Sequence, residues 1–443
     1  MDVDVTAEAV VPTSKFVTLV HPNMPTSDHV AQIDGSIEYR KSVDITHEPT
    51  DLSTKSPVEF IVHGTPNHLI DLSSFVLDVE LKITNSDGTI THRGDWKTHF
   101  INNLTQSLWS VVKVYLNDVC VESNYNNPQI SNLKFILTTP NTLVEERGEV
   151  QGCFPVTSQT LTHAAIDNAH LDENTIMNDR IAFSTKDIVH VRGPLQLDLS
   201  TCEKYLVDGV TFKLVLEPAP VAYLIKTAPP QRGAQTYDYK LLSVKLSCAK
   251  IKATDGAALA IRRQIAKTPF EYLMRRTILH REIIPAGFSE YVATRPFQNL
   301  IPNKIYIFLV DRDGATGNQL RYPFAYHHHG LSHYSVKING FQVAGGSVTN
   351  ADYRKEYMDS LLAHSNDYFI PFKNYTSGNF VLCVNCNDQS ELNNINIDKT
   401  GNLSVSLSFA PALDRPLVLH IAGSIDSPFT IDLDRTITTE FQY

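Results

Sequence analysis

Two stretches of twelve residues, 222 positions apart in this 443-residue chain, have the same form. They are SVVKVYLNDVCV, Ser110 to Val121, and SHYSVKINGFQV, Ser332 to Val343. In each, a run of strand-forming residues leads into Asn-Asp or Asn-Gly and out again. These dipeptides favour the type I′ turn of a two-residue β-hairpin, whose central residues need positive φ. Because the offset is about half of the chain, the match predicts an internal duplication.

A helical pattern follows both hairpins. The two segments are ISNLKFILTT, residues 130–139, and ADYRKEYMDSLLAH, residues 351–364. In the second segment Tyr353, Tyr357 and Leu361 lie at i, i+4 and i+8, which places them on one face of a helix. Each half of the chain is therefore predicted to carry a short helix after its hairpin.

Most of the chain from Val58 onward consists of short runs rich in β-branched and aromatic residues, separated by turn residues. Examples are VEFIVHG, SFVLDVELKIT, VTFKLVLEPAPVAYLI, KIYIFLVDRDG and GNLSVSLSFA. This rhythm is typical of a β-sandwich. The predicted fold class is all-β, a tandem pair of sandwiches with short inserted helices.

Changes in composition divide the chain. Residues 1–56 carry several prolines among polar residues and show no sustained period, so they are predicted to form an N-terminal arm or irregular lead-in. Residues 57–227 form the first predicted sandwich. The proline and glycine break at 228–236 is a linker, and the strand rhythm resumes in the second sandwich, 237–443.

Charge and composition limit the function classes. The formal net charge is −10, with 19% charged residues, so no diffuse attraction for nucleic acid is expected. The N-terminal MDVDVTAEAVVPTSKF lacks the basic region and apolar run of a secretory signal, and no segment approaches the roughly 20 apolar residues of a membrane-spanning helix. The chain is therefore expected to be made in a reducing compartment, with free thiols at Cys120, Cys153, Cys202, Cys248, Cys383 and Cys386.

Three consecutive histidines, His327, His328 and His329, raise the question of a metal site. In an extended strand the first and third share a face roughly 7 Å apart while the second points the other way. A zinc site needs further ligands, and no Cys or acidic residue stands nearby at ligand spacing. We therefore expect these histidines to be framework at the entrance of a strand. A charge change of His327 or His329 near neutrality, acting on a subunit contact, is the alternative hypothesis.

The other cysteine and aspartate residues that could carry chemistry are predicted to have structural roles. The CVNC sequence, Cys383 to Cys386, has no second CxxC, so buried thiols are expected. Asp311 and Asp313 lack the spaced oxygen ligands of a calcium loop and indicate a solvated loop. The motifs of the common nucleophile, nucleotide-binding and zinc-protease sites are absent. No catalytic, cofactor-binding or metal-binding residue is therefore predicted, and the protein is not expected to be an enzyme.

One segment is densely basic, AIRRQIAKTPFEYLMRRTILHRE, Ala260 to Glu282. Apolar residues interleave it, among them Phe270, Tyr272 and Ile278. It is expected to cross the surface between the two sandwiches with its arginines paired to carboxylates. If the protein contacts DNA or another polyanion, the part from Arg262 to Arg281 is the candidate.

Several stretches occur in the same order as in a known family. They are Ser56 to Thr89, with its IDL and Asp-Gly turn; Ser107 to Asn124, with its hairpin; and Val244 to Gly287, with its basic run and IPAG. They continue through LVDRDGATGNQLRYPFAYHHHGLSHYSVKING, where Tyr322 replaces the usual Asn, and the closing segment with Ile431-Asp432 and Asp434-Arg435. From about Pro57 to Tyr443 the chain resembles the major capsid protein of Polinton (Maverick) elements and adintoviruses.

The resemblance implies a double jelly roll, two tandem eight-stranded sandwiches, in a structural protein of a virion. It implies a homotrimer that forms a pseudo-hexameric capsomer, contacts with neighbouring capsomers, an icosahedral shell, and a penton protein of single jelly-roll type. Two other classes stay open. One is a virion spike or fibre module that binds a receptor or glycan through its loops, and the other is a cupin-like metalloprotein.

Overall fold

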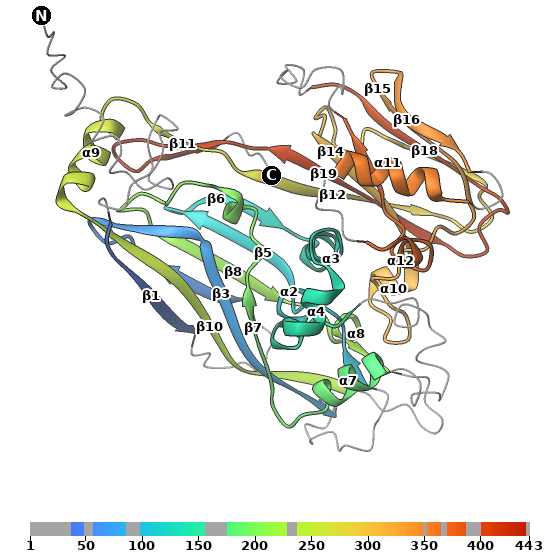
Figure 1. Ribbon diagram of the computed structural model, residues 1–443, viewed down its shortest axis with the longest axis horizontal. Coiled ribbons are helices and arrows are strands. Elements are labelled where there is room, and N and C mark those ends of the chain that lie inside the picture. Colours follow the sequence, from blue (N-terminus) through green and yellow to red (C-terminus); the bar gives the residue numbers. More distant parts are fainter. Residues whose placement is uncertain are drawn as a thin grey trace, which may run out of the picture.

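The computed structural model describes residues 37–47, 56–85, 98–155, 175–227, 237–348, 352–364, 370–386 and 400–439 (Figure 1). Its described part consists mainly of two β-sandwiches placed side by side, with helices between and beside them.

Eight strands form the first sandwich. They are β1 (Ile37–His47), β2 (Val58–Val62), β3 (His68–Asn85), β5 (Trp109–Leu116), β6 (Val119–Asn124), β7 (Val189–Pro194), β8 (Phe212–Pro218) and β10 (Tyr237–Ala253). One sheet has the order β1-β10-β3-β7 and the other β2-β8-β5-β6, with antiparallel pairing throughout.

Eight further strands form the second sandwich. They are β12 (Arg275–Ile284), β13 (Glu290–Thr294), β14 (Lys304–Asp311), β15 (Leu331–Ile338), β16 (Phe341–Ser347), β17 (Leu382–Asn385), β18 (Leu403–Phe409) and β19 (Leu417–Asp426). The sheets have the orders β12-β19-β14-β17 and β13-β18-β15-β16. When the eight strands of each sandwich are counted in chain order, both sandwiches have sheets of order 1-8-3-6 and 2-7-4-5. The predicted duplication is confirmed by this shared topology.

The two predicted hairpins occupy equivalent places, β5–β6 and β15–β16. Asn117 and Asp118 have φ of 43° and 67°, and Asn339 and Gly340 have φ of 51° and 87°, as a type I′ turn requires. Both hairpins also carry a bulge at the same place, between Val114 and Tyr115 in one and between Val336 and Lys337 in the other. The equivalence of the two stretches at an offset of 222 positions therefore extends to the backbone.

Helices follow the hairpins as predicted, α3 (Asn127–Thr138) in the first sandwich and α11 (Arg354–His364) in the second. The other helices are α2 (Leu104–Ser107), α4 (Asn141–Arg147), α7 (Thr175–Ser184), α8 (Val221–Leu224), α9 (Asp255–Ile265), α10 (Arg312–Thr316), α12 (Phe372–Thr376), and the 3-10 turns η2 (Gly148–Gln151) and η4 (Leu199–Thr201). Two small sheets complete the fold, β4 (His99–Phe100) with β9 (Ile225–Lys226), and β11 (Phe270–Tyr272) with β20 (Phe429–Ile431) and β21 (Ile437–Thr439).

The prediction of an irregular lead-in over residues 1–56 is wrong for Ile37–His47, because these residues form strand β1. Its register with β10 runs from Ile37 opposite Ala253 to His47 opposite Val244. Ile37, Tyr39, Val43 and Ile45 stand at every second position of β1 and share one face, which is the alternation of a strand, although Lys41 interrupts it and most of the other side chains are polar and exposed. Backbone pairing to a neighbouring strand makes this segment an edge strand.

The division between the sandwiches also differs from the sequence interpretation. Strand β10 begins the predicted second sandwich, yet it pairs with β1 and β3 at the centre of a first-sandwich sheet. The proline and glycine break at 228–236, which lies outside the described residues, therefore precedes the last strand of the first sandwich. The first sandwich ends with β10 at Ala253, and α9 and β11 connect it to β12, the first strand of the second sandwich.

The two sandwiches have apolar interiors. In β3 the buried residues Leu77, Val79 and Leu81 alternate with more exposed ones, and Phe75 stacks on Phe212 with ring centroids 4.4 Å apart. In the second sandwich Phe308 stacks on His420 at 4.9 Å. Across the described ranges, no helix is both long and apolar enough to cross a membrane.

Candidate functional site: the junction between the sandwiches

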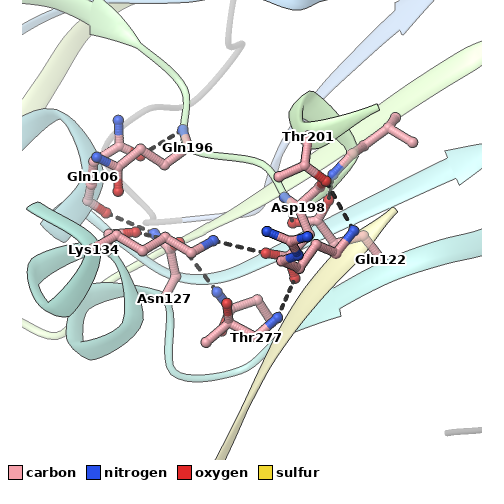
Figure 2. Close-up of polar contacts among 12 residues, drawn as sticks. Gln106, Glu122, Asn127, Lys134, Gln196, Asp198, Thr201 and Thr277 are labelled. Atoms are coloured by element: carbon pink, nitrogen blue, oxygen red, sulfur yellow. Dashed lines mark hydrogen bonds and ion pairs between the residues drawn. The ribbon is translucent and has the colours of Figure 1, made fainter. Parts of the chain in front are cut away.

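A cluster of buried charged groups lies where the first sandwich meets β12 of the second (Figure 2). Glu122 of β6 accepts hydrogen bonds from the backbone N–H groups of Asp198, at 2.9 Å, and Leu199, at 3.0 Å. Asp198 accepts from Lys134 Nζ at 2.8 Å and from the backbone N–H of Thr277 at 3.2 Å. The carboxylate of Asp198 therefore joins a helix of the first sandwich to a strand of the second.

Arg276 of β12 lies in the same cluster and is 3% exposed. Its guanidinium donates a hydrogen bond to the main-chain oxygen of Val121, the bulged residue of β6. Burial lowers the pKa of Arg276 to about 10, opposed by the charges of Glu122 and Asp198. Buried charges are tolerated where they pair or hydrogen-bond, and in this cluster Lys134 pairs with Asp198 at 2.8 Å while Glu122 accepts two backbone hydrogen bonds.

The carboxyl group of Glu122 is buried and lies near a second carboxylate. Burial, together with the nearby Asp198 charge, raises the pKa of Glu122 to about 7. Lys134 differs: burial lowers its pKa, but the Asp198 carboxylate outweighs this effect and the net shift is upward. The cluster therefore keeps its cations charged while one of its two acids takes up a proton near neutrality.

A second contact comes from the loop that precedes β15. The Tyr322 hydroxyl accepts a hydrogen bond from the backbone N–H of Asn102 at 3.2 Å, and Asn132 of α3 donates to the Tyr326 hydroxyl at 2.9 Å. Lys226, fully buried in β9, donates to the main-chain oxygen of Asn318 at 2.9 Å. The loop before α2, the helix α3 and the strand β9 are thus tied to one loop of the second sandwich.

A third contact is made by the small sheet β11-β20-β21, which lies against the first sandwich near residues 205–210. Tyr272 stacks on Phe429 with ring centroids 4.9 Å apart, and its hydroxyl donates to the main-chain oxygen of Tyr205 at 3.0 Å. Arg435 pairs with Asp208 at 2.8 Å. Gly209, with φ of 80°, lets the Arg435 side chain lie close to the backbone.

Together these contacts fix the orientation of the two sandwiches through buried groups from both. Their chemistry is hydrogen bonding, ion pairing and aromatic stacking. The arrangement therefore holds two similar sandwiches at a set angle.

Comparison with known proteins used both sequence and structure. No protein-family model and no curated protein matches the chain. Among solved structures, a chain of the Sputnik virophage aligns with a TM-score of 0.59 at 12% identity, covering 95% of this chain and 92% of its own. The mavirus major capsid protein aligns at 0.55 and 11%, covering 100% and 96%, and the Faustovirus major capsid protein at 0.56 and 10%, covering 90% and 92%.

The chain is a double jelly roll. The two sheets of four strands and their shared order are the arrangement of a jelly roll, repeated once. The predicted fold class is confirmed, including eight strands in each sandwich and short inserted helices.

In this double jelly roll the three histidines lie in a turn directly before β15. The spacing that an extended strand would give does not apply to this segment, because His329 and Gly330 have φ of 48° and 71°. The rings of His327 and His329 contact each other at 5.9 Å, while His328 packs on Tyr353, with Tyr353 Oη 2.8 Å from His328 Nδ1. In the described part of the chain, no group of three potential ligands is arranged to hold a metal.

The pKa values of the histidines in this turn bear on the hypothesis that one of them changes charge near neutrality. Burial, with smaller contributions from the neighbouring histidines, lowers the pKa of His329 to about 4. Burial also lowers the pKa of His328. These two side chains therefore stay neutral at neutral pH and serve as packing groups at the entrance of β15.

The other predicted residues have structural surroundings. All six cysteines are free thiols, and burial raises the pKa of Cys386 to about 12. Asp311 does not belong to a solvated loop: it caps the short helix α10 by accepting from the backbone N–H of Asp313 at 3.0 Å. It also pairs with Arg415 at 3.3 Å.

The basic segment from Ala260 to Glu282 crosses between the two sandwiches, as predicted, through α9, β11 and β12. Arg275 pairs with Asp426 at 3.5 Å, and Arg281 donates to Asn126 at 2.9 Å. The sequence marks this segment but not Glu122 and Asp198, whose only local signal is an acidic residue among apolar ones, after Val121 and between Leu197 and Leu199.

Proposed function

We propose that this protein is the major capsid protein of a virus or virus-like element, and that its work is structural. Three copies would form a capsomer with six jelly rolls around one axis, which approximates a hexagon and tiles an icosahedral shell. The observation that carries this proposal is the repeat of one strand order in two sandwiches held by a buried junction. Two of the compared proteins are named as major capsid proteins, which supports it.

The source proposed is the Polinton (Maverick) and adintovirus-like group, and the support is the collinear set of sequence stretches from Pro57 to Tyr443. The proposed location is the virion. Expected partners are two further copies, neighbouring capsomers, and a penton protein of single jelly-roll type at the vertices. Co-expression with such a partner, followed by electron microscopy, tests the last point: closed shells support it, and free trimers contradict it.

The first experiment is the mass of the purified full-length protein by light scattering, with negative-stain images of the same sample. A stable trimer with a hexagonal outline is expected. A chain that stays monomeric at high concentration would overturn the proposal and favour a spike or fibre module.

A further inference from the structure

The face that β1 and β10 turn toward the interior of the first sandwich is apolar along part of its length and basic at one end. It is apolar as far as Val43, which lies opposite the buried Cys248. The two rows that follow on the same face are Lys41 opposite Lys250 and Tyr39 opposite Lys252. They lie at the end of the sandwich where β10 leads into α9 (Figure 1).

His68 of β3 completes this basic surface, because it lies opposite Lys252 on the other side of β10. Tyr39 Oη lies 3.2 Å from His68 Nε2, and Lys252 Nζ lies 5.6 Å from the centroid of the Tyr39 ring. Tyr39 is 43% exposed and Lys41 is exposed as well. The five residues Tyr39, Lys41, His68, Lys250 and Lys252 form the surface that we call the lysine face.

Two of its three lysines have no carboxylate partner in the described part of the chain. Lys250 Nζ donates to the main-chain oxygen of His63 at 3.0 Å, and Lys41 makes no ion pair there. Lys252 alone is paired, with Glu38 at 2.8 Å. Like charges directly opposite each other on a strand pair are destabilising. Because acidic residues outnumber basic ones in this chain, 48 to 38, the lack of a carboxylate here indicates an anion from outside the chain.

A second lysine pair on the same sheet shows how neighbouring acidic residues can offset such a pair within the chain. Lys82 of β3 lies opposite Lys240 of β10. Glu80 and Asp238 stand two positions away on the same strands, and therefore on the same face. The lysine face has no acidic residue at such positions. The residues two positions from Lys41 and Lys250 are Tyr39, Val43, Cys248 and Lys252.

The segment from Arg262 to Arg281, which the sequence marks as the candidate for contact with a polyanion, has arginines engaged within the chain. Arg275, for example, pairs with Asp426 at 3.5 Å. Arg262 adjoins the lysine face, since its guanidinium donates to the side chain of Asn67, the residue before His68, at 2.7 Å. The surface with unpaired cations therefore lies on the strands that precede this segment.

We infer that the lysine face binds nucleic acid, with Lys41 and Lys250 on phosphate groups and Tyr39 stacked on an unpaired base. Lysines contact phosphates without regard to sequence, and every base has a face that an aromatic ring can stack on. An anionic membrane surface fits less well, because Tyr39 is the single large apolar side chain among the five residues. That the nucleic acid is a packaged genome rests on the proposed function.

Binding of fluorescein-labelled DNA to the full-length protein, measured by fluorescence anisotropy over a range of salt concentrations, tests the inference. Lys41→Gln/Lys250→Gln is expected to weaken binding of single-stranded and duplex DNA about tenfold at low salt, and to make the salt dependence shallower because fewer counterions are released. Tyr39→Leu is expected to weaken binding of the single strand about fivefold and to leave duplex binding unchanged, since stacking needs an unpaired base.

Matched controls separate the lysine face from the total charge of the protein. Lys245→Gln/Lys337→Gln makes the same change in net charge at two exposed lysines outside the face. Tyr125→Leu removes another exposed tyrosine with a lysine over its ring. These controls are expected to bind DNA as the wild type does. Circular dichroism and thermal unfolding check that every variant is folded.

Equal weakening by the lysine-face variants and their controls would overturn the inference, as would a wild-type chain that binds no DNA at low salt. Binding to phosphatidylserine vesicles but not to DNA would overturn it too and assign the face to a membrane. A trimer that binds no DNA refutes only this inference, whereas a monomer that binds DNA refutes only the proposed function.

Discussion

Arg435, close to the end of the described chain, forms an ion pair with Asp208 of the first sandwich, with 2.8 Å between Nη2 and Oδ1. Arg435 Nε also donates to the main-chain oxygen of Asp208 at 2.6 Å. Both side chains are largely buried. This pair fastens the segment that follows the second sandwich onto the first.

Arg435→Ala is expected to destabilise the protein by about 2–3 kcal/mol, because it removes two hydrogen bonds and leaves the Asp208 carboxylate without its closest cation. Arg435→Lys is expected to recover only part of this loss, since an ammonium lacks the fork of a guanidinium. Urea denaturation measures the effect. Lys186→Ala removes an exposed pair with Glu149 and serves as the control, with a change within about 0.5 kcal/mol. Equal effects of the two alanine variants would contradict the prediction.

Glu122→Gln is expected to change how stability depends on pH. The pKa of Glu122 is raised to about 7 in the folded protein, from an ordinary value of 4.5. The folded state therefore holds a proton that the unfolded state has lost, and the contribution of Glu122 to stability falls as the pH rises from 4.5 through 7. Glutamine does not titrate, so the variant does not lose stability in this way as the pH rises. Its free energy of unfolding relative to wild type should therefore increase by up to about 1.4 kcal/mol per pH unit over that window. Thermal unfolding across the window measures it, and a constant difference would show that Glu122 does not titrate there.

His420→Phe is expected to protect the protein at low pH. The His420 ring is fully buried and stacked on Phe308, and burial lowers its pKa to about 3 from 6.5. Unfolding lets this ring take up a proton, so wild type loses stability as the pH falls from 6.5 towards 3. A phenyl ring keeps the stacking and removes the titration. The variant should gain on wild type progressively below about pH 6.5 in urea denaturation, and parallel pH curves would contradict this expectation.

The second turn residues of the two equivalent hairpins, Asp118 and Gly340, give a matched test of backbone conformation. Both have positive φ, and an added Cβ at Gly340 would meet no atom within 4 Å. Gly340→Ala is expected to cost about 1 kcal/mol through conformation alone, and Asp118→Gly to stabilise by a few tenths up to about 1 kcal/mol.

Gly256→Ala provides the control for this pair. Gly256 also has open space around its Cβ position but lies in α9, where Ala is favoured over Gly, so the same substitution is expected to stabilise by about 0.5–1 kcal/mol. Thermal unfolding of the three variants shows whether each substitution stabilises or destabilises the protein. A stabilising Gly340→Ala would mean that the hairpin turn relaxes to negative φ.

The sequence predicted the features that depend on neighbours along the chain. The turn at Asn117-Asp118 and its copy at Asn339-Gly340 were predicted from residue preference for positive φ, and α3 and α11 from spacing. The histidine segment was assigned to the right place, the entrance of β15, but its turn was not predicted. His329 adopts positive φ beside Gly330, a conformation that a run of histidines and aromatics does not signal.

Contacts between distant residues were decided only by the tertiary structure. β1 has only a short alternation, at Ile37, Tyr39, Val43 and Ile45, and its place at the edge of the first sandwich depends on its pairing with β10. β10 belongs to the first sandwich because of its pairing with β3, although it follows the break that the sequence marks. Glu122, Asp198 and Arg276 are unremarkable charges in the sequence.

The sequence by itself therefore determined the class of fold and its duplication, since turn preference and alternation are local. The tertiary structure alone decided where one sandwich ends and which charges meet at the junction. The physical reason is that pairing between strands and burial of charges depend on groups far apart in the chain, whose energies no local pattern encodes.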